Sequence, residues 1–137
     1  DRSLHQQLAV RDHRSPVDVR NATLLLSRLP KGDRPDALIV SDDHLVQGAT
    51  CGVVGSGLKA GKDLDIIAFR NFPDQPPHEC PVTWLGFDVR TIVNRLLESV
   101  EAQRAGRDVP ARQLVEPCFE EEAADTLLRG NAPGGRT

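Results

Sequence analysis

Two neighbouring carboxylates, Asp42 and Asp43, follow a short apolar run at 37–40. A carboxylate accepts paired hydrogen bonds from vicinal hydroxyl groups, which is how either residue would hold a hydroxyl-bearing ligand. In open α/β sheets, ligands bind beyond the carboxyl ends of the strands, which is where these residues are expected to lie. Asp is also a residue type that caps helices, and the apolar spacing after Asp43 is helical. Ligand binding and helix capping both remain open.

A second polar pair, Arg70 and Asn71, follows the apolar run at 64–69. We expect this pair to occupy the same kind of corner between strand and loop. Arginine presents a planar fork suited to carboxylate or phosphate groups, so Arg70 is a second candidate ligand. The alternative is a surface charge paired with Asp65 or Asp74.

Four further residues are weaker candidates for the same site. His13 and Arg14 lie in the loop after a possible short strand at 8–10, on the side of the sheet where ligands are expected. Trp84 and Phe87 flank an extended crossover, and either aromatic face could pack on a ring of a bound ligand. Core packing is at least as good an interpretation for both, since large aromatic side chains are mostly structural.

Other chemistry has little support in the sequence. Metal binding could be imagined at 42–44 or 78–80, but neither spacing is a recognised ligand set, and we expect no metal and no cofactor. The glycines of 52–57 end a helix instead of joining a strand to a helix, which is the wrong context for a nucleotide loop. A phosphoacceptor receiver domain would need Lys and Ser/Thr where Arg70 and Thr83 stand. No nucleophile, base and orienting group are recognisable, so we expect no enzyme.

The apolar patterning predicts strands that alternate with helices. Strands are expected at 8–10, 37–40, 64–69, 81–85 and 114–119, and helices at 16–29, 43–58 and 88–105. Such alternation predicts a three-layer α/β sandwich with a mainly parallel sheet.

Composition limits the class of protein further. The chain has 137 residues and a formal net charge of -3 without a basic stripe, which argues for one domain and against DNA binding by this segment alone. Nothing resembles a signal peptide or a membrane span, and three scattered cysteines favour a reducing, cytoplasmic location. Met is absent, so we interpret the chain as a fragment or a processed form.

From about Leu8 to Glu122 the chain resembles the C-terminal part of the effector-binding core of LacI/GalR-type transcriptional regulators. Residues 34–43 are similar to the family's "RPDAI..AND", and Gly48 is similar to the glycine of "ALGA". Residues 57–69 look like "GL..G.DI.VVGF", and 81–83 resemble "PLTT". The four segments occur in the family's order and at its spacing.

The resemblance implies one lobe of a periplasmic-binding-protein-like type I fold, spanning 1–122 and including the post-crossover helix 88–105, with a flexible tail at 123–137. The family binds a small sugar-like effector between two lobes. It binds operator DNA as a homodimer through a helix-turn-helix domain, which is missing here together with most of the N-terminal lobe. We expect no membrane partner. The alternative function is a sugar-binding protein of a transport system.

In the family the last helix packs in the N-terminal lobe. Its apolar stripe is therefore expected to lack its usual partner here, and we predict that the chain associates through it. The stripe consists of Ile92, Val93, Leu96, Leu97 and Val100.

The sequence also departs from the family pattern. Asp43 matches a family Asp and carries over directly as an effector ligand, whereas Asp42 stands where the family usually has Asn. Arg70 stands where the family commonly has Asp, which makes an effector with an anionic group possible. Near the end, the family's "LV.RES" is not matched by residues 118–122.

Overall fold

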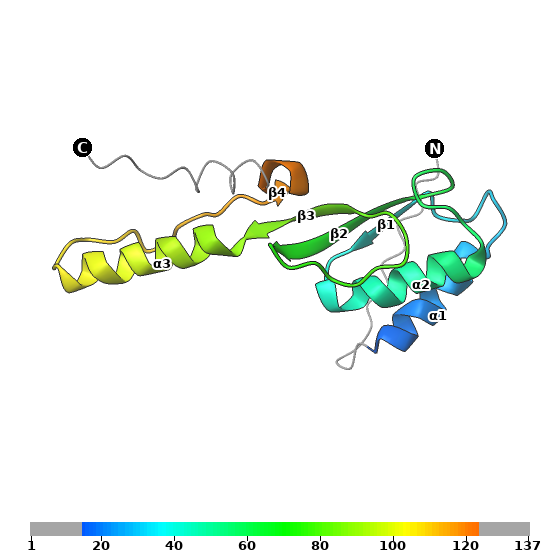
Figure 1. Ribbon diagram of the computed structural model, residues 1–137, viewed down its shortest axis with the longest axis horizontal. Helices are drawn as coiled ribbons and strands as arrows, with labels where there is room; N and C mark the ends of the chain where they lie inside the picture. The colour runs from blue at the N-terminus through cyan, green and yellow to red at the C-terminus, as the bar shows by residue number, and fades with distance from the viewer. Residues whose placement is uncertain (1–14, 124–137) are drawn as a thin grey trace. The chain divides into compact units, whose positions relative to one another are not determined.

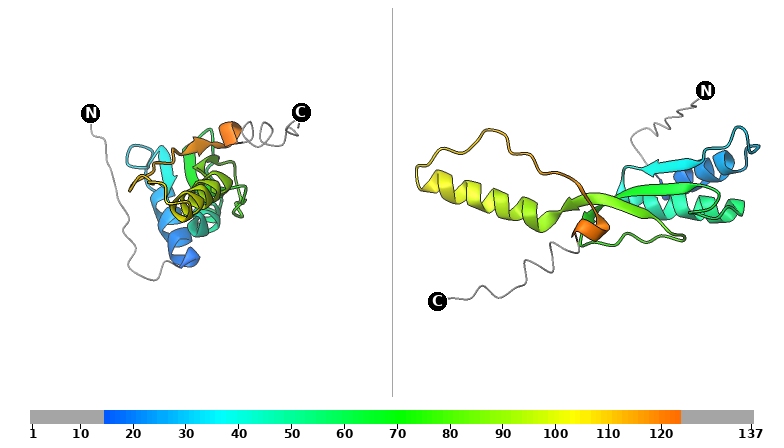
Figure 2. Two further views of the ribbon diagram at one scale, coloured as in Figure 1. Left: turned by 90° about the vertical axis from the view of Figure 1, so that its left-hand side faces the viewer. Right: turned by 90° about the horizontal axis from the view of Figure 1, so that it is seen from above.

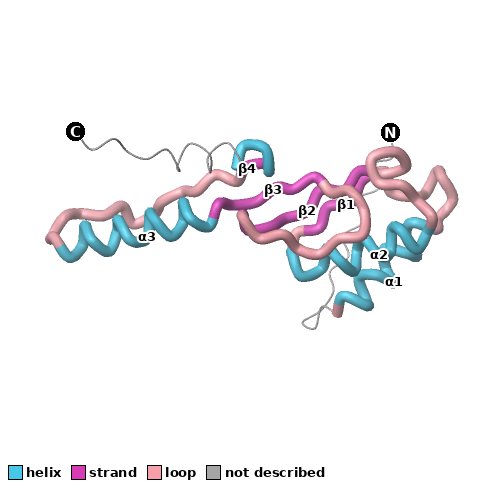
Figure 3. Tube along the Cα trace, viewed as in Figure 1, coloured by secondary structure: helices cyan, strands magenta, loops and turns pink. Residues whose placement is uncertain are grey.

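The computed structural model describes residues 15–123, and its helices and strands alternate along most of that range (Figure 1). The elements are α1 Pro16–Ser27, β1 Ala37–Val40, a 3-10 turn Asp43–Leu45, α2 Val46–Ser56, β2 Asp65–Phe72, β3 Thr83–Asp88, α3 Val89–Arg104 and β4 Cys118–Phe119. The strand order is β1-β2-β3-β4, with β1 and β2 parallel and β3 and β4 antiparallel. The predicted α/β class with a mainly parallel sheet is confirmed. Figure 3 shows the helices in cyan and the strands in magenta. The strand predicted at 8–10 lies outside the described residues.

Local signals set the helix boundaries. The Ser15 hydroxyl accepts a hydrogen bond from the Val17 amide at the start of α1, and the Asp88 carboxylate accepts one from the Arg90 amide at the start of α3. Gly57 ends α2 in the left-handed region at φ 84°, which glycine adopts without a steric penalty. These caps agree with the sequence predictions.

Two strand boundaries differ from prediction. Strand β2 continues to Phe72, so Arg70 and Asn71 lie within the strand and not in a corner after it. The alternation of buried and exposed positions continues through Arg70, which is only 5% exposed. Strand β3 runs to Asp88, past the predicted end at 85, and β4 is confined to Cys118–Phe119.

The chain divides into two compact units. The first consists of residues up to 69 together with 76–83, and the second of 70–75 together with the residues from 84 on. Strands β2 and β3 each run from one unit into the other. Each unit is described by itself below.

In the first unit, α1 and α2 lie side by side along the sheet (Figures 1 and 2). A core cluster of Val53, Leu64 and Ile66 joins α2 to β2. Ile39 and Ile67, which are register partners on the other face of the sheet, are 77% and 36% exposed. Among the described residues, the helices of this unit therefore cover one face of the sheet.

Contact between α1 and α2 depends on two glycines. A Cβ atom at Gly48 would lie 2.3 Å from the Pro16 carbonyl oxygen, and one at Gly52 would lie 2.6 Å from that of Arg20. Gly48 and Gly52 are four residues apart in α2, and the residues that they approach in α1, Pro16 and Arg20, are four residues apart in the same order. The two helices therefore run in the same direction.

The second unit contains the end of β2, most of β3, then α3 and β4. No residue of the 16-residue helix α3 is buried, and Val93, Leu96, Leu97 and Val100 are 45–61% exposed. The Ser99 hydroxyl and the Arg95 guanidinium contact residues 113 and 114, so the returning chain covers another side of this helix. No described helix combines the length and apolar character that crossing a membrane requires.

Candidate functional site

The acidic corner follows the carboxyl end of β1, as predicted. Asp42 has extended backbone geometry, and its Oδ1 accepts a hydrogen bond from the His44 amide (3.1 Å), so it caps the 3-10 turn. The side chains of Asp42 and Asp43 are 31% and 25% exposed. Asp42 thus performs the capping role that the sequence left open, and both carboxylates remain partly accessible to solvent.

His44 is a member of this corner that the ligand prediction did not include. Its Nδ1 lies 2.6 Å from Asp43 Oδ1 and 3.3 Å from Asp42 Oδ1, while its side chain is 88% exposed. The negative charge of Asp43 and the hydrogen bond to it raise the pKa of His44 above 6.5, and Asp42 adds to the shift. Below that raised pKa, the protonated His44 ring partly offsets the negative charge of the two carboxylates.

The raised pKa has a measurable consequence for the folded state. Because the folded-state pKa exceeds the unfolded value, the stabilising His44–Asp43 interaction is fully present below about pH 6.5 and is lost as the pH rises through the folded-state pKa. An NMR titration of the His44 ring should give a pKa above 6.5, and Asp43→Asn should lower it. A wild-type pKa at or below 6.5 would contradict the observed geometry.

Asp42, Asp43 and His44 each place one possible metal-ligand atom within 4.8 Å of the others. Their spacing along the sequence is not that of a recognised set of metal ligands. The hydrogen bonds between His44 and the carboxylates account for the clustering without an ion. We therefore assign no metal to this corner.

The remaining described candidates all lie in the second unit. Arg70 is buried, and its Nη2 donates to Glu120 Oε1 at 3.0 Å. Trp84 is 4% exposed, whereas Asn71 and Phe87 are half-buried. The pairing of Arg70 with Glu120 differs from both alternatives considered for it, Asp65 and Asp74. His13 and Arg14 lie outside the described residues.

A hollow of about 330 Å³ is present elsewhere in the second unit. It lies between α3 and the chain that follows it, and it contains none of the predicted ligand residues. The lining residues are Glu98, Ser99, Glu101, Ala102, Arg107, Asp108, Val109, Pro110 and Gln113.

Comparisons with known proteins identify relatives of one kind. No family model matches the chain. Over 82 residues, covering 57% of this chain, the sequence is 29% identical to the lactose operon repressor of Escherichia coli (strain K12). The structure is similar to that of a LacI regulator from Lactobacillus casei with bound Tris, with a TM-score of 0.60 and 18% identity over 77% of this chain.

The chain corresponds to only part of these proteins. It covers 23% of the length of the lactose operon repressor and 37% of the Lactobacillus casei chain. The structural likeness establishes the fold. Together the two comparisons support the resemblance noted in the sequence: part of this chain is similar in sequence to one LacI-type regulator, and its fold is similar to that of another.

Proposed function

We propose that this chain is an effector-binding part of a LacI-type transcriptional regulator and that Asp43 binds hydroxyl groups of a sugar-like effector. The observation that carries the proposal is the position of Asp43, a partly exposed carboxylate directly after a parallel strand. Ligands bind at this end of the strands in open α/β sheets. Asp42 lies beside it and is the second candidate, although its Oδ1 already caps the turn.

Regulation would follow from differential binding. An effector that binds one conformation of the regulator more tightly shifts the equilibrium toward that conformation, and operator affinity changes with it. Operator DNA would be bound by a separate helix-turn-helix domain, because this segment has a net charge of -3. Burial raises the pKa of the Cys80 and Cys118 thiols, which makes them poor nucleophiles. A regulatory role does not require an activated nucleophile.

Asp43→Ala tests the ligand assignment. In a thermal-shift screen of neutral sugars and sugar acids on the whole regulator, we expect Asp43→Ala to abolish the stabilisation that the best compound gives wild type. Loss of paired hydrogen bonds to a charged acceptor weakens binding by about 1.5–3 kcal/mol, or roughly 10- to 150-fold.

Asp36→Ala is the matched control for that experiment. It removes the same charge from an exposed position at the other end of β1 and should retain the thermal shift. An undiminished shift in Asp43→Ala would contradict the assignment.

We also propose that the exposed stripe of α3 associates with a second copy of the chain. Apolar residues recur on one face of α3, and none of its residues is buried. Multi-angle light scattering at increasing concentration should show a mass above that of the monomer, and Leu96→Glu should restore the monomer. Glu98→Lys, which changes a residue off the stripe, should leave the mass unchanged. A monomeric wild-type chain at high concentration would contradict this proposal.

A further inference from the structure

Arg70 is enclosed by two aromatic side chains. It is 5% exposed, and its guanidinium carbon lies 4.5 Å from the centre of the Phe72 ring and 5.2 Å from that of Trp84. Both rings are themselves buried, at 2% and 4% exposure. A guanidinium enclosed in this way requires a counter-charge, because burial of an unpaired charge is strongly unfavourable.

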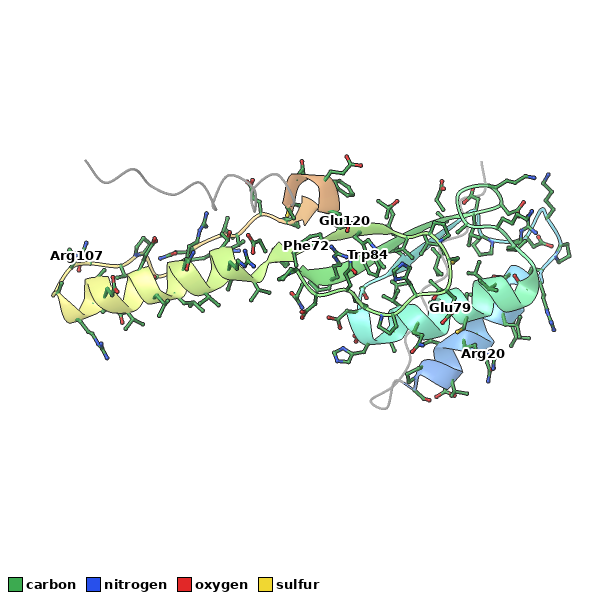
Figure 4. All side chains as sticks on the ribbon, viewed as in Figure 1. Arg20, Phe72, Glu79, Trp84, Arg107 and Glu120 are labelled. Atoms are coloured by element: carbon green, nitrogen blue, oxygen red, sulfur yellow. The ribbon has the colours of Figure 1, made fainter. Side chains whose placement is uncertain are left out.

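Glu120 supplies that counter-charge. Its Oε1 accepts a hydrogen bond from Arg70 Nη2 at 3.0 Å, although the two residues are 50 positions apart in the sequence. Glu120 directly follows β4, and its side chain is 46% exposed. Figure 4 shows Glu120 near Phe72 and Trp84, where β4 adjoins β3. Arg70 Nε is buried without a hydrogen-bond acceptor among the described residues, so Glu120 is the principal partner of this guanidinium.

Backbone packing brings these two side chains together. Gly86 of β3 pairs with Cys118 of β4, and a Cβ atom at Gly86 would lie 1.7 Å from the Arg70 carbonyl oxygen. Strand β3 therefore passes Arg70 at a separation that only glycine permits. The ion pair spans β3 and connects β2 to the residue after β4.

Both members of the pair stand at places where the sequence departs from the family pattern. Arg70 stands where a carboxylate is expected, and the acidic stretch 120–122 stands near an expected "RES". The two departures introduce charges of opposite sign, and the structure shows Arg70 and Glu120 in contact.

From this geometry we infer that Arg70 is a positioning residue that, with Glu120, fastens the β4 segment to β2 and β3. Its positive charge is used within the fold and does not select an anionic effector. The effector class is consequently not determined by Arg70, and a neutral, hydroxyl-rich molecule bound at Asp43 needs no contribution from this side chain. This inference is independent of the proposed function, because the ion pair requires no ligand.

A charge-reversal cycle in the full chain tests the inference. Arg70→Glu and Glu120→Arg each leave two like charges adjacent, and each should lower the thermal unfolding midpoint by about 5–10 °C. The double variant, which restores the pair with reversed polarity, should recover most of the loss. A purely steric role for Arg70 would give no such recovery.

Two milder variants keep the test informative if a single reversal does not fold. Glu120→Gln preserves shape and should lower the midpoint by a few degrees, whereas Glu121→Gln, at an exposed neighbouring position, should not change it. An unchanged midpoint in Glu120→Gln, or a double reversal no more stable than the sum of the single effects predicts, would overturn the inference. Neither result would test the proposed role of Asp43 in ligand binding.

Discussion

Gly52→Ala is expected to destabilise the chain by about 2–3 kcal/mol, because its new methyl group has no space between α1 and α2. The added Cβ would lie 2.6 Å from the Arg20 carbonyl oxygen and 2.8 Å from the Thr23 Cβ. Both atoms belong to buried or backbone positions that cannot rotate away. Thermal unfolding followed by circular dichroism should show a midpoint about 10 °C lower than that of wild type.

Gly55→Ala is the matched control, since it is in the same helix. Its Cβ would meet only the Leu24 side chain at 3.6 Å, which is an ordinary contact. Alanine is the better helix former by about 1 kcal/mol, so this variant should be as stable as wild type or slightly more stable. If both substitutions had the same effect, the close helix contact would not be the cause.

Gly86→Ala is expected to have a larger effect, of about 3 kcal/mol or more, because its Cβ would lie within 1.7 Å of a backbone oxygen. Strand β3 could accept the methyl group only by separating from β2 at Arg70. Trp84, the only tryptophan, is buried two residues earlier in β3 and reports such a separation. Its fluorescence emission should shift to longer wavelength in Gly86→Ala.

Gly32→Ala provides the comparison for this second variant. No atom lies within 4 Å of the Cβ position at Gly32, and its backbone does not require a positive φ. The expected change is neutral or slightly stabilising, because alanine reduces the freedom of the unfolded chain. An unchanged emission spectrum and midpoint in Gly86→Ala would show that β3 has room that the structure does not indicate.

The parts of the fold that sequence patterns predicted are those encoded locally. Ser15 and Asp88 start helices, Gly57 ends one, and Ala37–Val40 is a strand, because capping chemistry and apolar runs act over a few residues. The acidic corner at Asp42 was found for the same reason. The position of this corner could be predicted because it comes just after the apolar run that forms β1.

Features that depend on distant residues were not predictable in the same way. Strand β2 was expected to end before Arg70, because a charged residue normally signals the surface. Arg70 is buried only because Glu120, 50 positions later, is brought beside it. The acidic run at 120–122 gave no indication of which residue would pair with Arg70. The acidic corner at Asp42 and Asp43 was therefore predicted from the sequence, whereas the contact of His44 with these carboxylates and the pairing of Arg70 with Glu120 were not.

The place of β1 in the sheet has a consequence for handling the isolated chain. Among the described strands, β1 lies at an edge, with β2 on one side only, and Ile39 at its centre is 77% exposed. An apolar edge strand offers unpaired amide and carbonyl groups to any other extended chain, which makes it a template for aggregation. A lysine in place of Ile39 would oppose such strand addition without removing a buried side chain, and it is a practical route to concentrated samples for spectroscopy.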